Sequence, residues 1–211
     1  MEQILTVEEK KQIIDLYEKR LEELGNDVRT VGWSSRESQW LRFQVLTRGL
    51  ALQGRTILDI GCGLGDLVVF LDQQTGGDYR YLGIDISPRL IDRAATLHGG
   101  GNRAFRTGDL LQMTDVEPAD LVLMSGALTF RVSDNMALAQ SMLRRMYALT
   151  RESMAVNFLS SHVDYQLEKN FHYDPSQIFS FAKKLTPWVA LWHDYPLWEF
   201  TLQLHTHSRS F

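Results

Sequence analysis

The residues best suited to chemistry lie in one short stretch, where three glycines alternate with other residues just after an acidic one. Gly61, Gly63 and Gly65 follow Asp59 at alternate positions. Glycine adopts backbone angles that a Cβ forbids, and it lets the main chain approach a ligand closely. Apolar residues on both sides predict a strand, a tight loop and a helix whose free N–H groups face a bound molecule. Such a loop after the first strand of an α/β unit predicts a nucleotide-type binding site.

The charges around this loop narrow the choice of ligand. Dinucleotide sites use the spacing G-x-G-x-x-G, but Asp66 occupies the position of the third glycine here. A carboxylate at that position would repel a pyrophosphate, and Asp59 adds a second negative charge. The loop therefore favours a cationic ligand. S-adenosylmethionine (SAM) carries an ammonium and a sulfonium group and fits these charges better than a nicotinamide dinucleotide does.

Alternating strands and helices must position the loop. The apolar runs predict seven strands, at residues 56–60, 79–84, 103–107, 120–124, 154–159, 189–193 and 198–205. Helices between most of them predict a parallel sheet with helices on both faces. The last two strands are joined by a short hairpin-like link, so one of them should be antiparallel to the rest. We therefore expect an α/β fold with a seven-stranded, mostly parallel sheet whose last strand is antiparallel.

Two helices are predicted ahead of the sheet. Thr6 and Glu9 form a capping box for a helix that ends at Gly25, and Ser34 with Glu37 offers a second box for a helix through about Leu50. Residues 1–50 would form a helical extension that packs on the core or closes the glycine loop as a lid. Residues 51–211 would form a Rossmann-like core. Because no linker or repeat divides the sequence, residues 1–211 are predicted to be a single domain.

Composition argues against several functions. The net charge of −4 gives no general positive field, so no DNA partner is expected. No run approaches the roughly 18 apolar residues of a membrane span, and the acidic N-terminus does not resemble a signal peptide. The single cysteine, Cys62, excludes an intramolecular disulfide and a cysteine-based zinc site. We expect a cytoplasmic protein without a metal; the oligomeric state is not predicted.

Four short segments, in order along the chain, resemble the class I SAM-dependent methyltransferases. They are Asp59-Ile60-Gly61-Cys62-Gly63-Leu64-Gly65, Asp85 at the end of the second strand, Gly108-Asp109-Leu110, and Ala119-Asp120-Leu121-Val122-Leu123. The resemblance covers roughly residues 30–205. It implies a Rossmann-like fold, SAM as the cofactor and methyl transfer as the reaction.

The resemblance also implies roles for single residues. The glycines would pass beneath the methionine part of SAM, with Asp59 facing its amino group. Asp85 would accept hydrogen bonds from both ribose hydroxyls, and Asp109 would accept one from the adenine amino group. Arg42, in preference to Arg36, is expected to bind the SAM carboxylate. The predicted cofactor-binding residues are Trp33, Arg42, Asp59, Gly61, Cys62, Gly63, Asp85, Ile86, Gly108, Asp109, Leu110, Ser125 and Gly126.

The acceptor site is less clearly marked. Methyl transfer from a sulfonium is a direct displacement, in which positioning alone can supply roughly 7–11 kcal/mol. A general base is needed only if the acceptor is protonated. His162 and His193 are the candidates for such a base, although surface or structural roles are open for both. The N-terminal segment and the loops after the fourth and fifth strands supply the predicted substrate-binding residues, which are Trp33, Phe130, Asn157, Ser160, Tyr165 and Tyr173.

The motifs separate the classes of acceptor in part. Base amino-group methylation in this fold usually comes with a D/N-P-P-Y/F motif after the fourth strand, where this chain has Ser125-Gly126-Ala127-Leu128. Cytosine C5 methylation needs a cysteine nucleophile, and Cys62 lies in the cofactor loop. The leading hypothesis is methylation of an O or N atom of a small-molecule acceptor. A protein or tRNA methyltransferase and a non-catalytic SAM-fold binding subunit are the alternatives.

Overall fold

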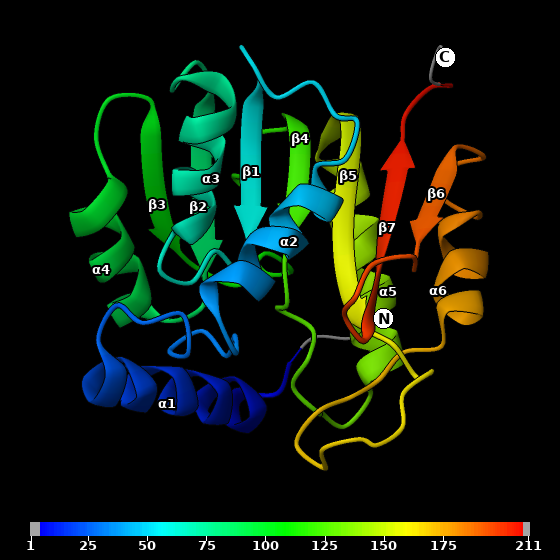
Figure 1. The fold of residues 1–211 in the computed structure, drawn as a ribbon, viewed down its shortest axis with the longest axis horizontal. Coiled ribbons are helices and arrows are strands. Elements are labelled where there is room, and N and C mark those ends of the chain that lie inside the picture. Colours follow the sequence, from blue (N-terminus) through cyan, green and yellow to red (C-terminus); the bar gives the residue numbers. More distant parts are fainter. Residues whose placement is uncertain (1–4, 209–211) are drawn as a thin grey trace.

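A seven-stranded mixed sheet forms the centre of the computed structural model, which describes residues 5–208 (Figure 1). The strand order is β3-β2-β1-β4-β5-β7-β6. Pairing is parallel among β1 to β5, whereas β7 is antiparallel to both β5 and β6. The strands are β1 (Thr56–Ile60), β2 (Arg80–Asp85), β3 (Arg103–Thr107), β4 (Ala119–Met124), β5 (Thr150–Leu159), β6 (Val189–Trp192) and β7 (Glu199–His205). The predicted fold is confirmed, and the antiparallel strand is inserted between β5 and β6.

Helices cover both faces of the sheet. The helices are α1 (Val7–Leu24), α2 (Arg36–Leu46), α3 (Asp66–Thr75), α4 (Pro88–His98), α5 (Asn135–Ala148) and α6 (Pro175–Ala182). Phe43 of α2 and Phe70 of α3 pack on one face of the sheet, and Leu143 of α5 and Ile178 of α6 pack on the other. Strands that are covered on both sides bury nearly every side chain, which explains their continuous apolar runs.

The capping residues in the sequence predicted the bounds of α1 better than those of α2. Thr6 and Glu9 form the expected capping box, and α1 ends at Gly25 as predicted. For α2 the prediction was wrong by one residue at the start, because Ser35 caps the helix and its partner is Ser38. The helix also ends at Leu46 rather than near Leu50. Leu50 still packs against the core from the loop, so the apolar pattern continues beyond the helix.

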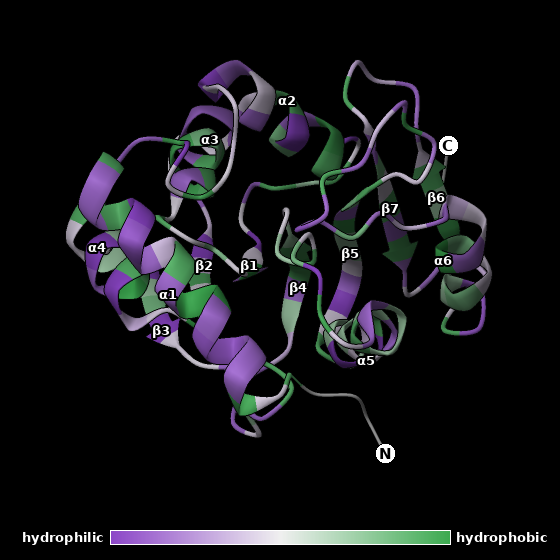
Figure 2. Cartoon of the chain, turned by 90° about the horizontal axis from the view of Figure 1, so that it is seen from below, coloured by the Kyte–Doolittle hydropathy of each residue, from purple (hydrophilic) through white to green (hydrophobic). Residues whose placement is uncertain are grey.

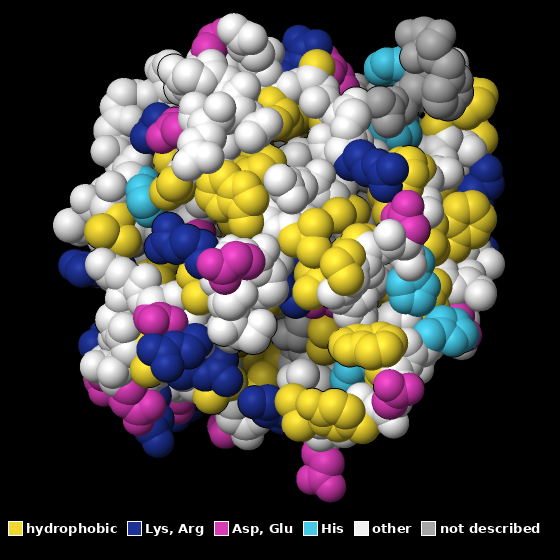
Figure 3. All heavy atoms as spheres, in the orientation of Figure 1, with side chains coloured by type: hydrophobic (Ala, Val, Ile, Leu, Met, Phe, Trp, Pro, Cys, Tyr) yellow, Lys and Arg dark blue, Asp and Glu magenta, His cyan; other side chains and the backbone are white. Residues whose placement is uncertain are grey.

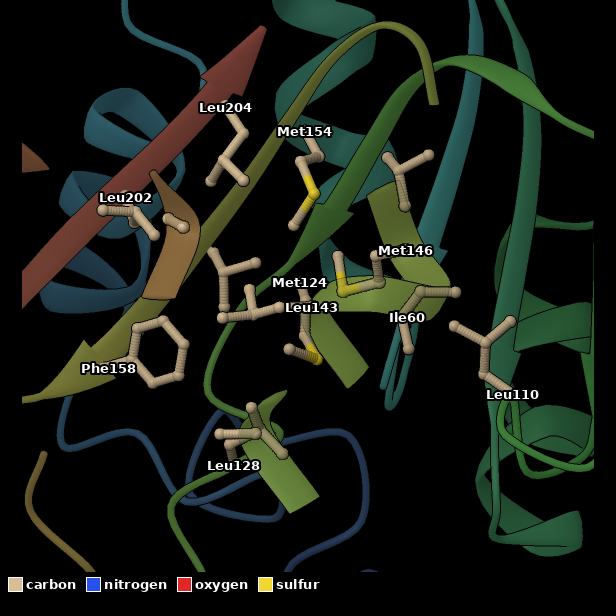
Figure 4. Close-up of a cluster of buried hydrophobic side chains, with 14 of the residues drawn as sticks. Ile60, Leu110, Met124, Leu128, Leu143, Met146, Met154, Phe158, Leu202 and Leu204 are labelled. Carbon is tan, nitrogen blue, oxygen red and sulfur yellow. The ribbon is translucent and has the colours of Figure 1, made fainter. Parts of the chain in front are cut away.

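The helix α1 lies apart from both layers. It crosses the C-terminal ends of the parallel strands instead of covering a face of the sheet, as the views from the front and from below agree (Figures 1 and 2). On the face of the sheet that α5 and α6 cover, a buried apolar cluster includes Ile60, Leu110 and Met124 (Figure 4). Within residues 5–208, no helix is long and apolar enough to cross a membrane.

Candidate cofactor and active site

A cavity lies between α1 and the C-terminal ends of β1, β2 and β4. It encloses about 140 Å³, roughly ten times the space that one water molecule needs, so it is sized for a ligand. It lies where the strand order changes direction, because β1 pairs with β2 on one side and with β4 on the other. Ligands of open α/β sheets bind at this switch point.

The glycine loop forms the floor of the cavity and has little space for side chains. The backbone N–H groups of Gly61 and Cys62 donate to the carbonyl of Ile84 at the end of β2, at 2.7 and 3.1 Å. A Cβ on Gly61 would lie 2.5 Å from the Cβ of Ala127. Gly63 has a φ of 54°, which favours glycine. No side chain caps the N-terminus of α3, which follows this loop.

Two carboxyl groups, the buried Asp59 and the half-buried Asp85, lie at the ends of neighbouring strands. Asp59 of β1 accepts a hydrogen bond from the Tyr81 hydroxyl at 2.7 Å, and burial raises its pKa to about 7. Asp85 of β2 accepts from the backbone N–H groups of Gly63 at 3.0 Å and Ser87 at 2.9 Å. Burial raises the pKa of Asp85 as well, while these hydrogen bonds lower it. Both groups line the cavity, so a cation or hydroxyl donor placed there would find strong acceptors.

Two further carboxylates line the cavity and are tied to the N-terminal helices. Asp66 at the start of α3 accepts from the side-chain amide of Gln39 in α2 at 2.8 Å. Asp109 follows β3, and its Oδ2 lies 2.8 Å from the Lys10 ammonium of α1. Its Oδ1 accepts from the backbone N–H of Leu111 at 3.1 Å. Among residues 5–208, no lysine or arginine lines the cavity.

The end of β4 is held by a residue of β5. Asn157 accepts from the backbone N–H of Gly126 at 2.7 Å and donates to the Ser125 hydroxyl at 3.2 Å. The Thr129 hydroxyl donates to the Gly126 carbonyl at 3.1 Å. Trp33 packs so closely here that a Cβ on Gly126 would lie 2.3 Å from its indole ring. The β4 turn and Trp33 therefore form one wall of the cavity.

The structure brings together nearly all of the predicted cofactor residues. Those that line the cavity are Trp33, Asp59, Gly61, Cys62, Gly63, Asp85, Ile86, Gly108, Asp109, Leu110, Ser125 and Gly126. Arg42 is the exception. Its guanidinium forms a buried, two-pronged ion pair with Glu199 of β7 and lies 4.1 Å from the centre of the Trp33 ring. The expectation that Arg42 binds the SAM carboxylate does not fit this arrangement, because Glu199 already neutralises it.

Most of the predicted acceptor residues lie away from the cavity. Trp33 and Phe130 line it. Asn157 does not line it, but its side chain forms hydrogen bonds to the turn after β4. Ser160 is buried and accepts from the backbone N–H of His162. The Tyr173 hydroxyl donates to the Leu128 carbonyl at 3.0 Å.

The remaining candidates lie on the outer loops. Tyr165 is 74% exposed. The rings of His162 and His193 lie 6.1 Å apart, and neither histidine lines the cavity. In this structure neither is placed to act as a base on a group bound there.

Residues of α1 were not expected at the site as individual contacts. Ile13, Ile14 and Tyr17 line the cavity, and burial raises the pKa of the Tyr17 hydroxyl. Their spacing along a capped amphipathic helix was visible in the sequence. That spacing shows which residues share a face, but it cannot show what the face covers.

Comparisons with known proteins agree with this architecture. A family model described as a methyltransferase domain matches residues 52–199. The fold is similar to that of magnesium protoporphyrin IX methyltransferase (ChlM) from Synechocystis PCC 6803 with bound S-adenosylhomocysteine (SAH), with a TM-score of 0.67 and 17% identity over 93% of this chain and 99% of that one. No curated protein matches the sequence.

Two other solved structures share the fold. The DhpI–SAH complex has a TM-score of 0.68 and 16% identity, covering 92% of this chain and 95% of that one. A TehB-like SAM-dependent methyltransferase from Corynebacterium glutamicum ATCC 13032 has a TM-score of 0.58 and 18% identity, covering 96% of this chain and 100% of that one. The family match extends over well more than half of the chain. The chain therefore belongs to the methyltransferase-domain family and is a SAM-dependent methyltransferase with the class I fold.

Proposed function

We propose that this enzyme transfers the methyl group of SAM to an O or N atom of a small-molecule acceptor. The observation that carries the proposal is the position of the cavity beneath α1. Trp33 and Phe130 line the same cavity as the glycine loop and Asp85. An acceptor that meets the methyl group there must fit under the helix, which favours a small molecule over a folded macromolecule.

The four carboxylates would hold different parts of SAM. In the proposed arrangement Asp59 and Asp66 face the ammonium and sulfonium end, Asp85 accepts from the ribose hydroxyls, and Asp109 accepts from the adenine amino group. The SAM carboxylate has no basic partner among the lining residues that the structure describes. Its available donors are the uncapped N–H groups at the start of α3 and the amide of Gln39, which suit an anion.

The proposed reaction is a single displacement. A lone pair of the acceptor attacks the methyl carbon, the carbon–sulfur bond breaks toward sulfur, and SAH is left as a neutral thioether. Any proton on the acceptor atom passes to solvent. The chain contributes by orienting the two reactants and excluding water, which is the main source of rate in such a reaction. Asn157 supports this role because it fixes the β4 turn beside the methyl position.

Three further predictions from the sequence are part of this proposal. They are the single-domain organisation of residues 1–211 with an extension at 1–50, the cytoplasmic location, and the assignment of single residues to cofactor and acceptor. Methyl transfer to a protein or to tRNA is the competing outcome, and the experiment below separates it from the small-molecule reaction.

The test uses the purified protein with SAM, SAH and methyl-labelled SAM. Calorimetry should detect binding of both ligands at micromolar concentrations, and label from SAM should pass into the low-molecular-mass fraction of a cell extract. Label that appears only in protein or RNA would favour the competing outcome. Absence of binding by either ligand at high micromolar concentration would contradict the cofactor assignment itself.

A further inference from the structure

The inner face of α1 presents a short pattern to the cavity. Ile13, Ile14 and Tyr17 line it, and Lys10 contacts Asp109 at its edge. The four residues are spaced i, i+3, i+4 and i+7, so they share one face of the helix. No residue of α1 is fully buried. The helix therefore rests on the rim through polar contacts instead of being packed into the core.

The opposite face of α1 carries mostly charged side chains, which face solvent. Lys11 pairs with Asp15, and Lys19 pairs with Glu23, along the exposed side of the helix. Acidic and basic side chains gather over this part of the molecule in Figure 3. The two faces thus differ sharply, and Lys10 is the lysine that turns inward: its side chain is 23% exposed, against 65% for Lys11.

Further contacts hold the helix to the strand ends. The Glu9 carboxylate accepts from the backbone N–H of Ser133 at 2.6 Å. Glu18 accepts from the Ser87 hydroxyl at 3.0 Å, and Glu22 pairs with Arg89. These three contacts join α1 to the loop after β4 and to the start of α4. Among the contacts of α1 with the core, the pair of Lys10 with Asp109 involves a carboxylate that lines the cavity.

We propose that Lys10 is a cofactor-positioning residue, and that α1 thereby forms part of the adenosine subsite. The inference rests on the proposed function, because it takes Asp109 as the acceptor for the adenine amino group. The ammonium of Lys10 fixes the Asp109 carboxylate in place from the edge of the cavity, beside the lining residues Ile13 and Ile14. The docking of α1 over the strand ends and the binding of adenine then depend on the same carboxylate, Asp109.

The geometry of Asp109 permits both partners at once. A carboxylate has about four acceptor positions. The backbone N–H of Leu111 donates to Oδ1, whereas Lys10 lies 2.8 Å from Oδ2 as an ion pair and forms no hydrogen bond to it. This leaves acceptor capacity for an amino group. Because the side chain of Asp109 is only 7% exposed, the attraction of the ammonium is weakly screened.

The test compares SAH binding in five forms of the full-length protein: wild type, Lys10→Met, Lys10→Arg, Lys11→Met and Glu22→Ala. Methionine keeps the stem of Lys10 and removes its charge, so affinity for SAH should fall about tenfold, the lower end for a charge-assisted contact. Arginine should restore most of it. Lys11→Met removes an exposed charge next in sequence. Glu22→Ala loosens the other end of α1 without touching the cavity.

Hydrogen exchange of the α1 amides gives a second readout. SAH should slow exchange in α1 of the wild type and of Lys11→Met, and it should slow it much less in Lys10→Met. The rate of SAH dissociation should rise in Lys10→Met to the same extent as affinity falls. The melting temperature without ligand should fall more in Lys10→Met, which leaves the Asp109 carboxylate unpaired, than in Glu22→Ala, which removes an exposed pair. The rescue of SAH affinity by Lys10→Arg then separates a role in binding from a role in stability.

The outcomes are distinct. Unchanged or tighter SAH binding by Lys10→Met would overturn the inference. Tighter binding would mean that Lys10 competes with adenine for Asp109, and unchanged binding would mean that Lys10 does not contribute to the adenine site. An equal loss in Glu22→Ala would overturn it too, because any loosening of α1 would then suffice. If the wild type does not bind SAH at all, the proposed function fails and not merely the role of Lys10.

Discussion

Lowering the pH from 8 to 5 should weaken SAH binding by about a hundredfold, because Asp59 must be ionised to pair with the ligand's ammonium group. Burial raises the pKa of Asp59 to about 7; the Tyr81 hydrogen bond opposes this, and the charges of Asp85 and Asp66 add to it. If the ammonium lowers this pKa below 5 in the complex, affinity follows the ionised fraction of the free protein. That fraction is about 1% at pH 5 and about 90% at pH 8. The ratio corresponds to about 3 kcal/mol.

The stability of the ligand-free protein should change with pH in the opposite sense. The pKa of Asp59 in the fold, about 7, lies above its ordinary value of 3.8. Between these values the native state holds a proton that the unfolded chain has lost. The contribution of Asp59 to the free energy of unfolding is therefore fully present below pH 4 and is lost as the pH rises through 7.

Titration calorimetry at several pH values, in buffers with different ionisation enthalpies, measures both affinity and proton release. At pH 6 the wild type should release close to one proton for each SAH bound, and at pH 8 few or none. Asp59→Asn should bind more weakly at pH 8 and lose most of the pH dependence. An equal affinity of the wild type at pH 5 and pH 8 would refute the argument. The same slope in Asp59→Asn would assign the titration to another group.

Three other predictions follow from single contacts. Glu199→Gln leaves the buried Arg42 guanidinium without its counter-charge, so the free energy of unfolding measured with denaturant should fall by about 3–5 kcal/mol. Adding Arg42→Met should recover most of this loss. A loss under about 1 kcal/mol in Glu199→Gln would contradict the argument. Asp85→Ala should weaken SAH binding about a hundredfold or more, because two ribose hydroxyls lose their acceptor; unchanged calorimetric affinity would exclude that role. Gly126→Ala places a side chain at a φ of 75°, with its Cβ 2.3 Å from the Trp33 ring. Its melting temperature should therefore fall, and it should fall less in a Trp33→Leu background, where the clash is relieved.

Local sequence signals predicted most of the fold. The capping box at Thr6 and the bounds of β1 and β3 are confirmed. Each depends on residues within a few positions of one another. Two adjacent serines, in contrast, offer nearly equal caps for α2, and only the backbone angles at Ser35 decide between them. Strand β5 starts at Thr150, before the predicted Met154, because it pairs with β4 across a register shift.

The site was predictable where it follows from strand ends and not where it depends on distant partners. Asp59, Asp85 and Asp109 come at or just after the ends of β1, β2 and β3, so the topology alone gathers them. The partner of Arg42 lies 157 positions further along the chain, and no local pattern identifies it. The positions of His162 and His193 outside the cavity were unpredictable for the same reason. Their loops follow β5 and β6, but nothing in the sequence says where those loops turn.

The position of β7 in the sheet determines the order in which the last strands can pair during synthesis. All seven of its residues are buried, and it separates β6 from the rest of the sheet. As the chain leaves the ribosome, β6 emerges first and has no edge to join until β7 follows. Until then β5 presents an open edge, which is a template for pairing with another chain. A nonsense mutation shortly before Glu199 would make that open edge permanent, and we expect the truncated product to aggregate instead of losing only its last strand.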